Sequence, residues 1–189
     1  MRSQIVAGGA AVLLLTARMV SAAGPVMGPI LNTANGHNYY LLGPDTWTGD
    51  EASAQALGGT LATVRNSQEN AWIYSEFMPT ANNNLWIGFT DPSHDTVGGS
   101  THAANFVWAS GEHSTYRNWA AGEPSNNGGN EWYTLLQYQT YNLVQPLQWN
   151  DVQNVQGTTY GVAEVAPEPT SIGIIGLAAG MLLCRRRGV

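Results

Sequence analysis

The loop-rich second half of the chain constrains its fold more than any other feature. Residues 90–165 are dominated by Gly, Asn, Ser and Thr, with only short apolar segments between them. So long an irregular stretch is uncommon inside a compact domain and usually has a function. The only cysteine, Cys184, lies near the carboxyl end, so no disulfide can fasten these loops. The chain must therefore hold them by packing, by hydrogen bonds or with a bound ion.

The first half has the signals of two helices. Thr48-Gly49-Asp50-Glu51 and Asn66-Ser67-Gln68-Glu69 each place Glu three residues after a capping side chain, a pattern typical of helix starts. We expect one helix over about 49–57 and a second from 66 to about 77, which Pro79 closes.

Short apolar segments predict the strands of an α+β domain. All seven tryptophans lie within residues 24–166, so a substantial core is available. Strands are expected at 39–42, 61–64 and 85–89, and near 105–108, 133–137, 147–151 and 159–165.

The amino terminus has the pattern of an export signal. Arg2 precedes an almost unbroken apolar run over residues 5–16, and Ser21-Ala22-Ala23 follows. This order is typical of a signal peptide that is cut after residue 23. The alternative is a retained anchor, because Arg18 interrupts the approach to the cut.

The carboxyl terminus combines Pro167-Glu168-Pro169, an uncharged run over residues 172–184, and Arg185-Arg186-Arg187. As a helix this run would span about 20 Å, less than the ~30 Å hydrocarbon core of a membrane. The three parts resemble the PEP-CTERM sorting signal of polysaccharide-secreting bacteria, which an exosortase-type membrane protease cuts. The resemblance implies a domain at residues 24–166, exported to the cell surface or extracellular matrix and transiently anchored by the tail at 167–189. A permanent short anchor is the alternative.

The charge of the domain excludes one class of partner. Between residues 24 and 166 only Arg65 and Arg117 are basic, against twelve Asp and Glu, and the chain has no lysine. Nucleic-acid binding normally requires a basic surface, so no nucleic acid is expected as a partner. The carboxylates suit a hard cation with oxygen ligands, although solubility alone also explains them.

Two acidic motifs in the second half stand at an informative spacing. Glu123-Pro124-Ser125 is followed by Glu131, eight residues after the first Glu, and Trp149 precedes Asn150-Asp151. Together with two helices and the Trp86-Ile87-Gly88 strand, these motifs resemble the C-type lectin-like family over residues 36–165. The resemblance implies an α+β fold with two helices, two small antiparallel sheets and a long calcium-binding loop region.

The resemblance also implies one site that binds calcium (Ca2+) and sugar, formed by Glu123, Ser125, Glu131, Asn150 and Asp151. The chemistry agrees, because three carboxylates, an amide and a hydroxyl supply the oxygen ligands that calcium prefers. Two coordination places would remain for neighbouring sugar hydroxyls, which would also form charge-assisted hydrogen bonds to the carboxylates. The alternative is a solvated acidic loop without an ion.

Position 125 departs from the family pattern. Sugar-binding members usually have Asn or Asp there, whereas Ser125 has a shorter side chain and no amide. Glu123 in first position is the pattern of the mannose, glucose and fucose type. Pro124 permits the cis peptide that, in the family, turns both flanking side chains toward the ion. A second departure is the lack of cysteines, since the family usually pins its long loop with disulfides.

Other residues suggest two further metal sites. Asp91 and Asp95, with Asn126, resemble the auxiliary calcium site of the family, but a turn at Asp91-Pro92 explains them as well. Three histidines invite a zinc site, but they lack the i, i+4 spacing of a metalloprotease helix, so surface histidines are the simpler interpretation. They are His94, His102 and His113.

The sequence therefore predicts an extracellular, calcium-dependent carbohydrate-binding module of a bacterial surface or exopolysaccharide matrix, and not an enzyme. The second hypothesis is a lectin-like domain that binds protein, or serves as a structural matrix unit, without binding sugar. In principle Glu123 and Glu131 could act as a glycosidase pair. Carboxylates that hold calcium stay ionised, however, and are poor general acids.

Overall fold

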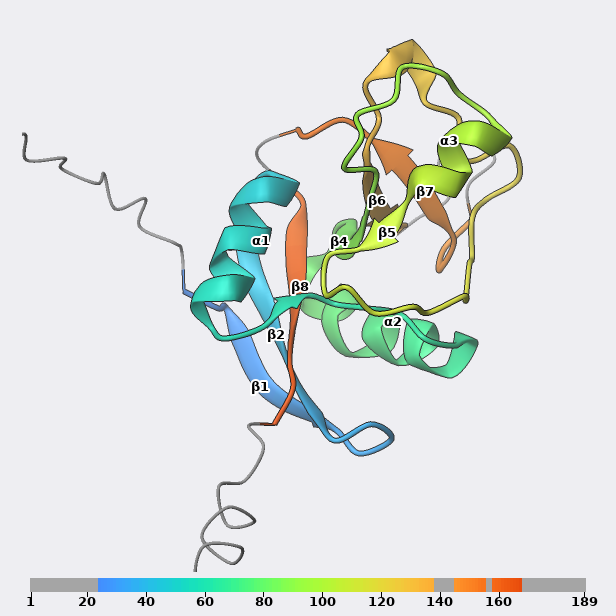
Figure 1. The fold of residues 1–189 in the computed structure, drawn as a ribbon. Helices are drawn as coiled ribbons and strands as arrows, with labels where there is room; N and C mark the ends of the chain where they lie inside the picture. The colour runs from blue at the N-terminus through green and yellow to red at the C-terminus, as the bar shows by residue number, and fades with distance from the viewer. Residues whose placement is uncertain (1–23, 138–144, 156–157, 168–189) are drawn as a thin grey trace, which may run out of the picture.

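The computed structural model describes residues 24–137, 145–155 and 158–167 (Figure 1). The predicted signal peptide at residues 1–23 and, apart from Pro167, the predicted sorting tail at residues 167–189 lie outside this part. Within the described ranges no helix has the length and apolar character needed to cross a membrane.

Eight strands form one hydrogen-bonded sheet in the order β1-β2-β8-β4-β6-β7, with β3 paired to β8 and β5 to β4. The strands are β1 (Met27–Asn32), β2 (His37–Pro44), β3 (Thr60–Leu61), β4 (Leu85–Thr90), β5 (Val107–Trp108), β6 (Tyr133–Leu136), β7 (Trp149–Val152) and β8 (Tyr160–Val165). The α+β class is confirmed. The two small sheets that were expected are joined into one, because β4 pairs in parallel with β8 at Leu85↔Tyr160 and Trp86↔Gly161.

The first helix, α1 (Trp47–Ala56), begins earlier than the sequence predicted. Thr46 and not Thr48 is its N-cap, with the Thr46 hydroxyl accepting from the Gly49 N–H at 3.0 Å. Glu51 does not reach back to the cap, because its carboxylate is buried and accepts from the Leu61 N–H at 2.8 Å. The predicted capping box is therefore wrong, and Glu51 instead fixes β3 against the helix.

The second helix, α2 (Ser67–Ala81), confirms the second predicted start and corrects its end. The Asn66 side chain accepts from the Glu69 N–H at 2.8 Å, as a cap should. Pro79 lies inside the last turn and does not stop the helix. The helix continues because one missing N–H in a last turn removes only one hydrogen bond. It ends at Asn82, which is left-handed and donates to the Met78 carbonyl at 2.8 Å.

Two short helical segments in the loop-rich half were not predicted. They are α3 (Ser100–Asn105) and the 3-10 turn η1 (Asn127–Gly129). Figure 1 shows α3 beside β5 and β7, at the end of the molecule away from β1.

An aromatic core joins the loop-rich half to the first half. The Phe89 ring of β4 lies 4.4 Å from that of Trp108 and 5.9 Å from that of Trp149, between ring centroids. Trp149 is fully buried, and its indole N–H donates to the Asn70 side chain of α2 at 2.8 Å. Aromatic packing of this kind stabilises the contact between the two halves.

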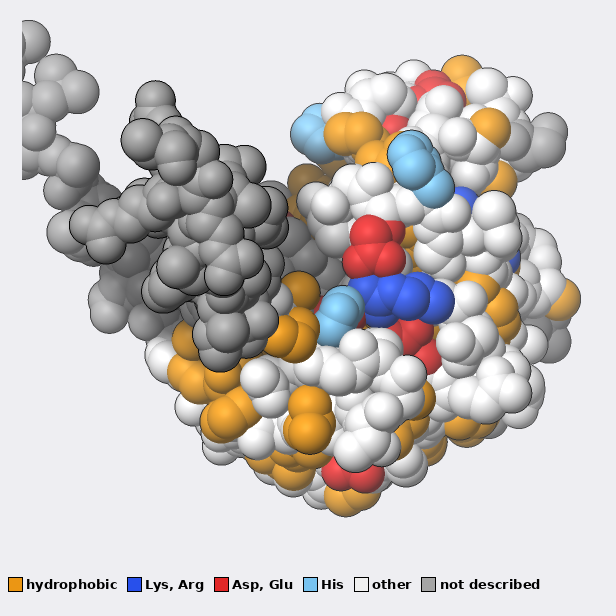
Figure 2. All heavy atoms as spheres, turned by 60° about the horizontal axis from the view of Figure 1, so that its bottom comes forward, with side chains coloured by type: hydrophobic (Ala, Val, Ile, Leu, Met, Phe, Trp, Pro, Cys, Tyr) orange, Lys and Arg blue, Asp and Glu red, His pale blue; other side chains and the backbone are white. Residues whose placement is uncertain are grey.

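One ion cluster fastens the loop after β5. Arg65 pairs with Glu69 of α2 at 2.8 Å, with Glu164 of β8 at 2.8 Å and with Glu112 of the loop at 2.5 Å. His37 lies 2.5 Å from Glu164. Figure 2 shows a basic side chain between acidic ones on this face, with a histidine beside them. The cluster thus connects three separate segments of the chain.

One buried carboxyl works against stability. Asp50 of α1 is 1 % exposed, packs against Gly161, and has one oxygen without a hydrogen-bond partner among the described residues. Burial, and secondly the negative charge of Asp45, raise the pKa of Asp50 to about 8. In the unfolded chain the same carboxyl ionises near its ordinary value. Wild-type stability should therefore fall as the pH rises through this interval, by up to about 1.4 kcal/mol per pH unit.

Asp50→Asn should raise the melting temperature by several degrees at pH 8, because the amide keeps the volume of the carboxyl and does not ionise. At pH 4 the variant and the wild type should melt alike, since Asp50 is then protonated in the native state. Glu76→Gln on α2 is the control and should leave the pH dependence unchanged. An Asp50→Asn variant that melts no higher than the wild type at pH 8 would contradict this account.

Candidate metal and ligand site

The site is built around Asp151 on β7. Its side chain is fully buried, and its two oxygens accept from the Ser125 N–H at 2.9 Å and the Asn126 N–H at 2.8 Å. Strand β7 pairs with β6 through Asp151 and Thr134. This carboxylate therefore ties the loop that carries the acidic motif to the sheet.

Glu131 closes the other end of this loop. Its carboxylate accepts from the Asn127 N–H at 2.5 Å and from the Ser125 hydroxyl at 3.3 Å, and its own N–H donates to the Asn126 side chain at 3.0 Å. Burial raises the pKa of Glu131, and the nearby charge of Glu123 adds to the effect. The Glu131 carboxylate is thus fixed in position, but burial and the neighbouring Glu123 disfavour its negative charge.

Glu123 and Asn150 supply oxygens without partners. The peptide bond between Glu123 and Pro124 is cis. One carboxylate oxygen of Glu123 and the amide oxygen of Asn150 are buried without a hydrogen-bond partner among the described residues. Burial, and then the neighbouring Asp151 carboxyl, raise the pKa of Glu123. Orphaned buried oxygens of this kind require an explanation, and an ion is one of them.

The donor set therefore fits a hard cation such as calcium, which takes carboxylate and amide oxygens. Hydrogen bonds bring together Ser125, Glu131 and Asp151. Glu123 lies close enough to Asp151 for that carboxyl to raise its pKa, and Asn150 precedes Asp151 on β7. Within the described ranges, no group of three His, Cys, Asp or Glu side chains is close enough together to hold a metal ion. The ligand roles of the five residues remain predictions.

For His102 the sequence analysis predicted the wrong environment. It is fully buried, so the prediction of a surface histidine is wrong for this position. Helix α3, which the sequence did not reveal, places its Nε2 3.2 Å from Asp151 and 2.9 Å from the Glu131 carbonyl, and its Nδ1 3.3 Å from Asp91. Both neighbours of Nε2 can only accept, so Nε2 carries a proton.

The other two histidines lie at the surface, as expected. His94 and His113 are exposed, and the His94 ring stacks on Trp132 with centroids 4.2 Å apart. The stacked ring gives His94 a packing role.

The residues of the auxiliary calcium hypothesis lie together but bond to their own loop. Asp91 accepts from the Ser93 N–H at 2.8 Å and from the Asp95 N–H at 3.2 Å. Burial alone would raise the pKa of Asp91, but these hydrogen bonds and the charge of His102 lower it. The Asn126 amide donates to the Asp95 carbonyl at 2.7 Å. The turn hypothesis accounts for these contacts, and an auxiliary calcium ion stays a prediction.

Comparison with known proteins identifies relatives. The family model of the Lectin C-type domain matches residues 44–155. A lectin of Pleurodeles waltl is 31% identical over 122 residues, which are 62% of this chain and 63% of that protein. Ladderlectin of Oncorhynchus mykiss is 27% identical over 110 residues, 57% of this chain and 50% of that protein. The chain thus spans less than two thirds of the length of these two relatives.

Solved structures share the fold. The C-type lectin CEL-I from Cucumaria echinata superposes with a TM-score of 0.57 at 20% identity, over 70% of this chain and 91% of that one. Human lithostathine gives 0.56 at 22% identity, over 72% and 96%. At these identities the likeness concerns the fold, while the family match covers the segment that contains the site. The chain belongs to the family of C-type lectin domains.

Proposed function

We propose that this chain is a calcium-dependent carbohydrate-binding module whose site is formed by Glu123, Ser125, Glu131, Asn150 and Asp151. The observation that carries the proposal is the pair of buried oxygens on Glu123 and Asn150 that lack partners among the described residues. They lie near the carboxylates of Glu131 and Asp151, neither of which pairs with an arginine among the described residues. A divalent cation would satisfy the oxygens and offset the charge in one step.

In this proposal the side chains have different tasks. Calcium, when bound, would supply coordination places for sugar hydroxyls. Glu123 and Glu131 would accept hydrogen bonds from the same hydroxyls, while Asp151 holds the loop in place through the Ser125 and Asn126 N–H groups. Ser125 would donate from a short side chain that already contacts Glu131. Binding, and not catalysis, is the task that such an arrangement can perform.

Named relatives support a sugar ligand. A relative from Patiria pectinifera, 26% identical over 137 residues, is an alpha-N-acetylgalactosamine-specific lectin. The CD23 domain of cow, with a TM-score of 0.55, was solved in the presence of a GlcNAc2Man3 oligosaccharide. We expect a glycan or an exopolysaccharide as the ligand here.

A second function has its own support. A calcium-independent type II antifreeze protein shares the fold with a TM-score of 0.53 over 77% of this chain. The fold therefore does not require calcium, and Ser125 lacks the amide of the sugar-binding pattern. A domain that binds protein, or builds a matrix, without sugar is the alternative.

The location of the domain is also a proposal. The order of the terminal segments supports export, a PEP-CTERM tail cut by an exosortase-type protease, and a place at a bacterial surface or in its extracellular matrix. Intact-mass analysis of the exported product tests this, since cleavage would leave a carboxyl end close to Pro167.

Calcium should stabilise the fold. A ligand that binds only the native state adds about 2.7 kcal/mol at a hundredfold excess over Kd, which raises the melting temperature by roughly 5 to 10 °C in a domain of this size. Glu123→Ala should abolish that rise, and Glu76→Ala on α2 should retain it. Thermal unfolding with and without millimolar calcium measures both. If calcium does not raise the melting temperature of the wild type, the proposed metal site is wrong.

Ser125→Asn should tighten sugar binding several-fold. The wild-type hydroxyl replaces an amide donor, and one neutral hydrogen bond of about 1 kcal/mol corresponds to roughly fivefold in Kd. Titration of methyl mannoside in calcium compares the wild type, Ser125→Asn and the control Ser125→Ala. An Asn variant that binds calcium but no glycan on an array would favour the protein- or matrix-binding alternative.

A further inference from the structure

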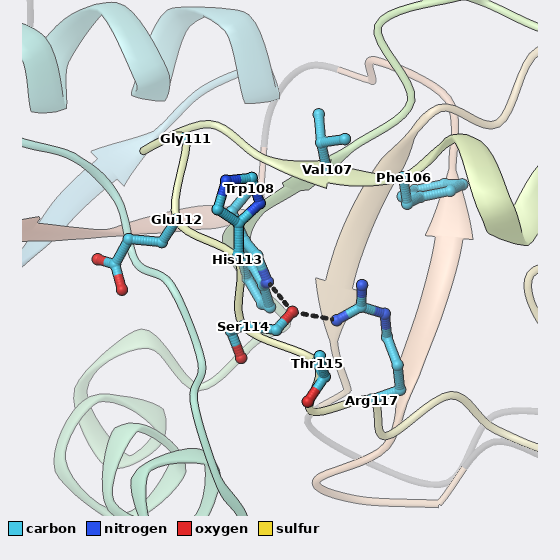
Figure 3. A pocket seen from close by; sticks show the side chains of 9 residues that line it. All are labelled: Phe106, Val107, Trp108, Gly111, Glu112, His113, Ser114, Thr115 and Arg117. Atoms are coloured by element: carbon cyan, nitrogen blue, oxygen red, sulfur yellow. Dashed lines mark hydrogen bonds between the residues drawn. The ribbon is translucent and has the colours of Figure 1, made fainter.

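A cavity of about 450 Å³ lies apart from the candidate calcium site, between β5 and the loop over residues 111–117 (Figure 3). None of the five residues of the calcium site lines it. Its volume falls in the range of small-molecule sites, which are commonly about 300–1,000 Å³. The cavity therefore has room for a ligand of its own.

Arg117 is the main polar feature of this cavity. Its Nη1 donates to the Ser114 carbonyl at 2.9 Å and the Tyr116 carbonyl at 2.7 Å, and its guanidinium lies 4.2 Å from the centroid of the Phe89 ring. Figure 3 shows the side chain rising from its loop toward Phe106 and Trp108. Nε and Nη2 donate to no residue within the described ranges. The guanidinium is thus held in place with one edge free.

The free edge is unusual in so acidic a domain. Between residues 24 and 166 there are twelve Asp and Glu and only two Arg. Arg65 pairs with three carboxylates, whereas Arg117 forms no ion pair with any described residue. Partial burial lowers the pKa of Arg117, but an arginine stays protonated in proteins. Its charge is therefore accessible at the surface and has no carboxylate partner among the described residues.

The acidic residue that lines the cavity beside Arg117 is already paired. Glu112 is the only carboxylate that lines it, and Arg65 binds that carboxylate in two hydrogen bonds of 2.5 and 2.8 Å. A ligand anion would therefore meet Arg117 without a competing free acid.

The rest of the lining combines apolar and hydroxyl-binding groups. Val107 is 49 % exposed and offers an apolar wall. His113 and Thr115 are exposed, and their side chains form no hydrogen bond with residues in the described part of the chain. A ligand that fits these groups has a carboxylate on a ring that also carries hydroxyls.

We propose that this cavity binds an acidic saccharide, with the carboxylate of a uronic acid unit held by Nε and Nη2 of Arg117 and its ring hydroxyls by His113 and Thr115. Guanidinium and carboxylate match in a bidentate arrangement that lysine cannot reproduce. Binding in this cavity needs no metal ion, so the proposal can be tested independently of the calcium site. The ligand would be a charged unit of a polysaccharide.

Trigalacturonic acid and its neutral methyl ester are a matched pair of probes for the full-length chain. The buffer is freed of calcium with a resin, because soluble chelators are themselves polycarboxylates. Titration followed by ¹H–¹⁵N spectra should show binding of the acid, with a shift of the Trp108 indole resonance. That N–H shares the Ser114 carbonyl with Arg117 (Figure 3). The Trp47 indole, bonded to the Ile87 carbonyl, should not move.

Arg117→Gln should weaken this binding by roughly ten- to hundredfold, the usual effect of removing charge-assisted hydrogen bonds, and Arg117→Lys should restore only part of it. Near-ultraviolet circular dichroism checks that each variant remains folded. Glu123→Ala should bind the acid as the wild type does. Equal binding of the methyl ester, equal binding by folded Arg117→Gln, or no binding by the folded wild type would each overturn the proposal and assign Arg117 to covering Phe89.

Discussion

The buried carboxylate of Asp151 is the interaction on which the loop-rich half depends. It accepts from the Ser125 and Asn126 N–H groups and faces His102 from a strand that is itself paired on the sheet. A buried acceptor left without its donors would be costly, so the loop and the carboxylate hold each other in place. Residues 24–166 contain no cysteine, so contacts such as this one hold the loop without a disulfide.

The same strand also anchors the segment before the acidic motif. The Trp149 N–H donates to the Asn118 carbonyl at 2.8 Å, and the Ala120 N–H donates to the Trp149 carbonyl at 2.9 Å. Strand β7 therefore forms hydrogen bonds with the chain both before and after Glu123, while the Trp149 ring packs in the core. Such a frame fixes the backbone on both sides of Glu123, which reduces the ordering that the binding of any ligand at this loop would require.

The sequence predicted those elements that depend on neighbours along the chain. The Asn66 cap, the apolar strand at Leu85–Thr90 and the spacing of Glu123 and Glu131 are local patterns. It failed where contacts distant in sequence decide. Glu51 is diverted from the helix start by β3, and the parallel pairing of β4 with β8 joins two expected sheets. His102 is buried, and its ring contacts Asp91 and Asp151, which are distant in sequence. The six-residue helix that carries it is too short to show a periodic pattern.

Amide hydrogen exchange in calcium-free protein tests most directly whether the loop is held in advance by Asp151. The account predicts that the Ser125 and Asn126 N–H groups exchange at least about a hundredfold more slowly than in an unstructured peptide. The Gly88 N–H of β4, bonded to the Ala62 carbonyl at 2.9 Å, serves as the protected reference. Exchange of Ser125 and Asn126 at the unstructured rate, with Gly88 still protected, would show that the loop forms only with a ligand and would contradict the account.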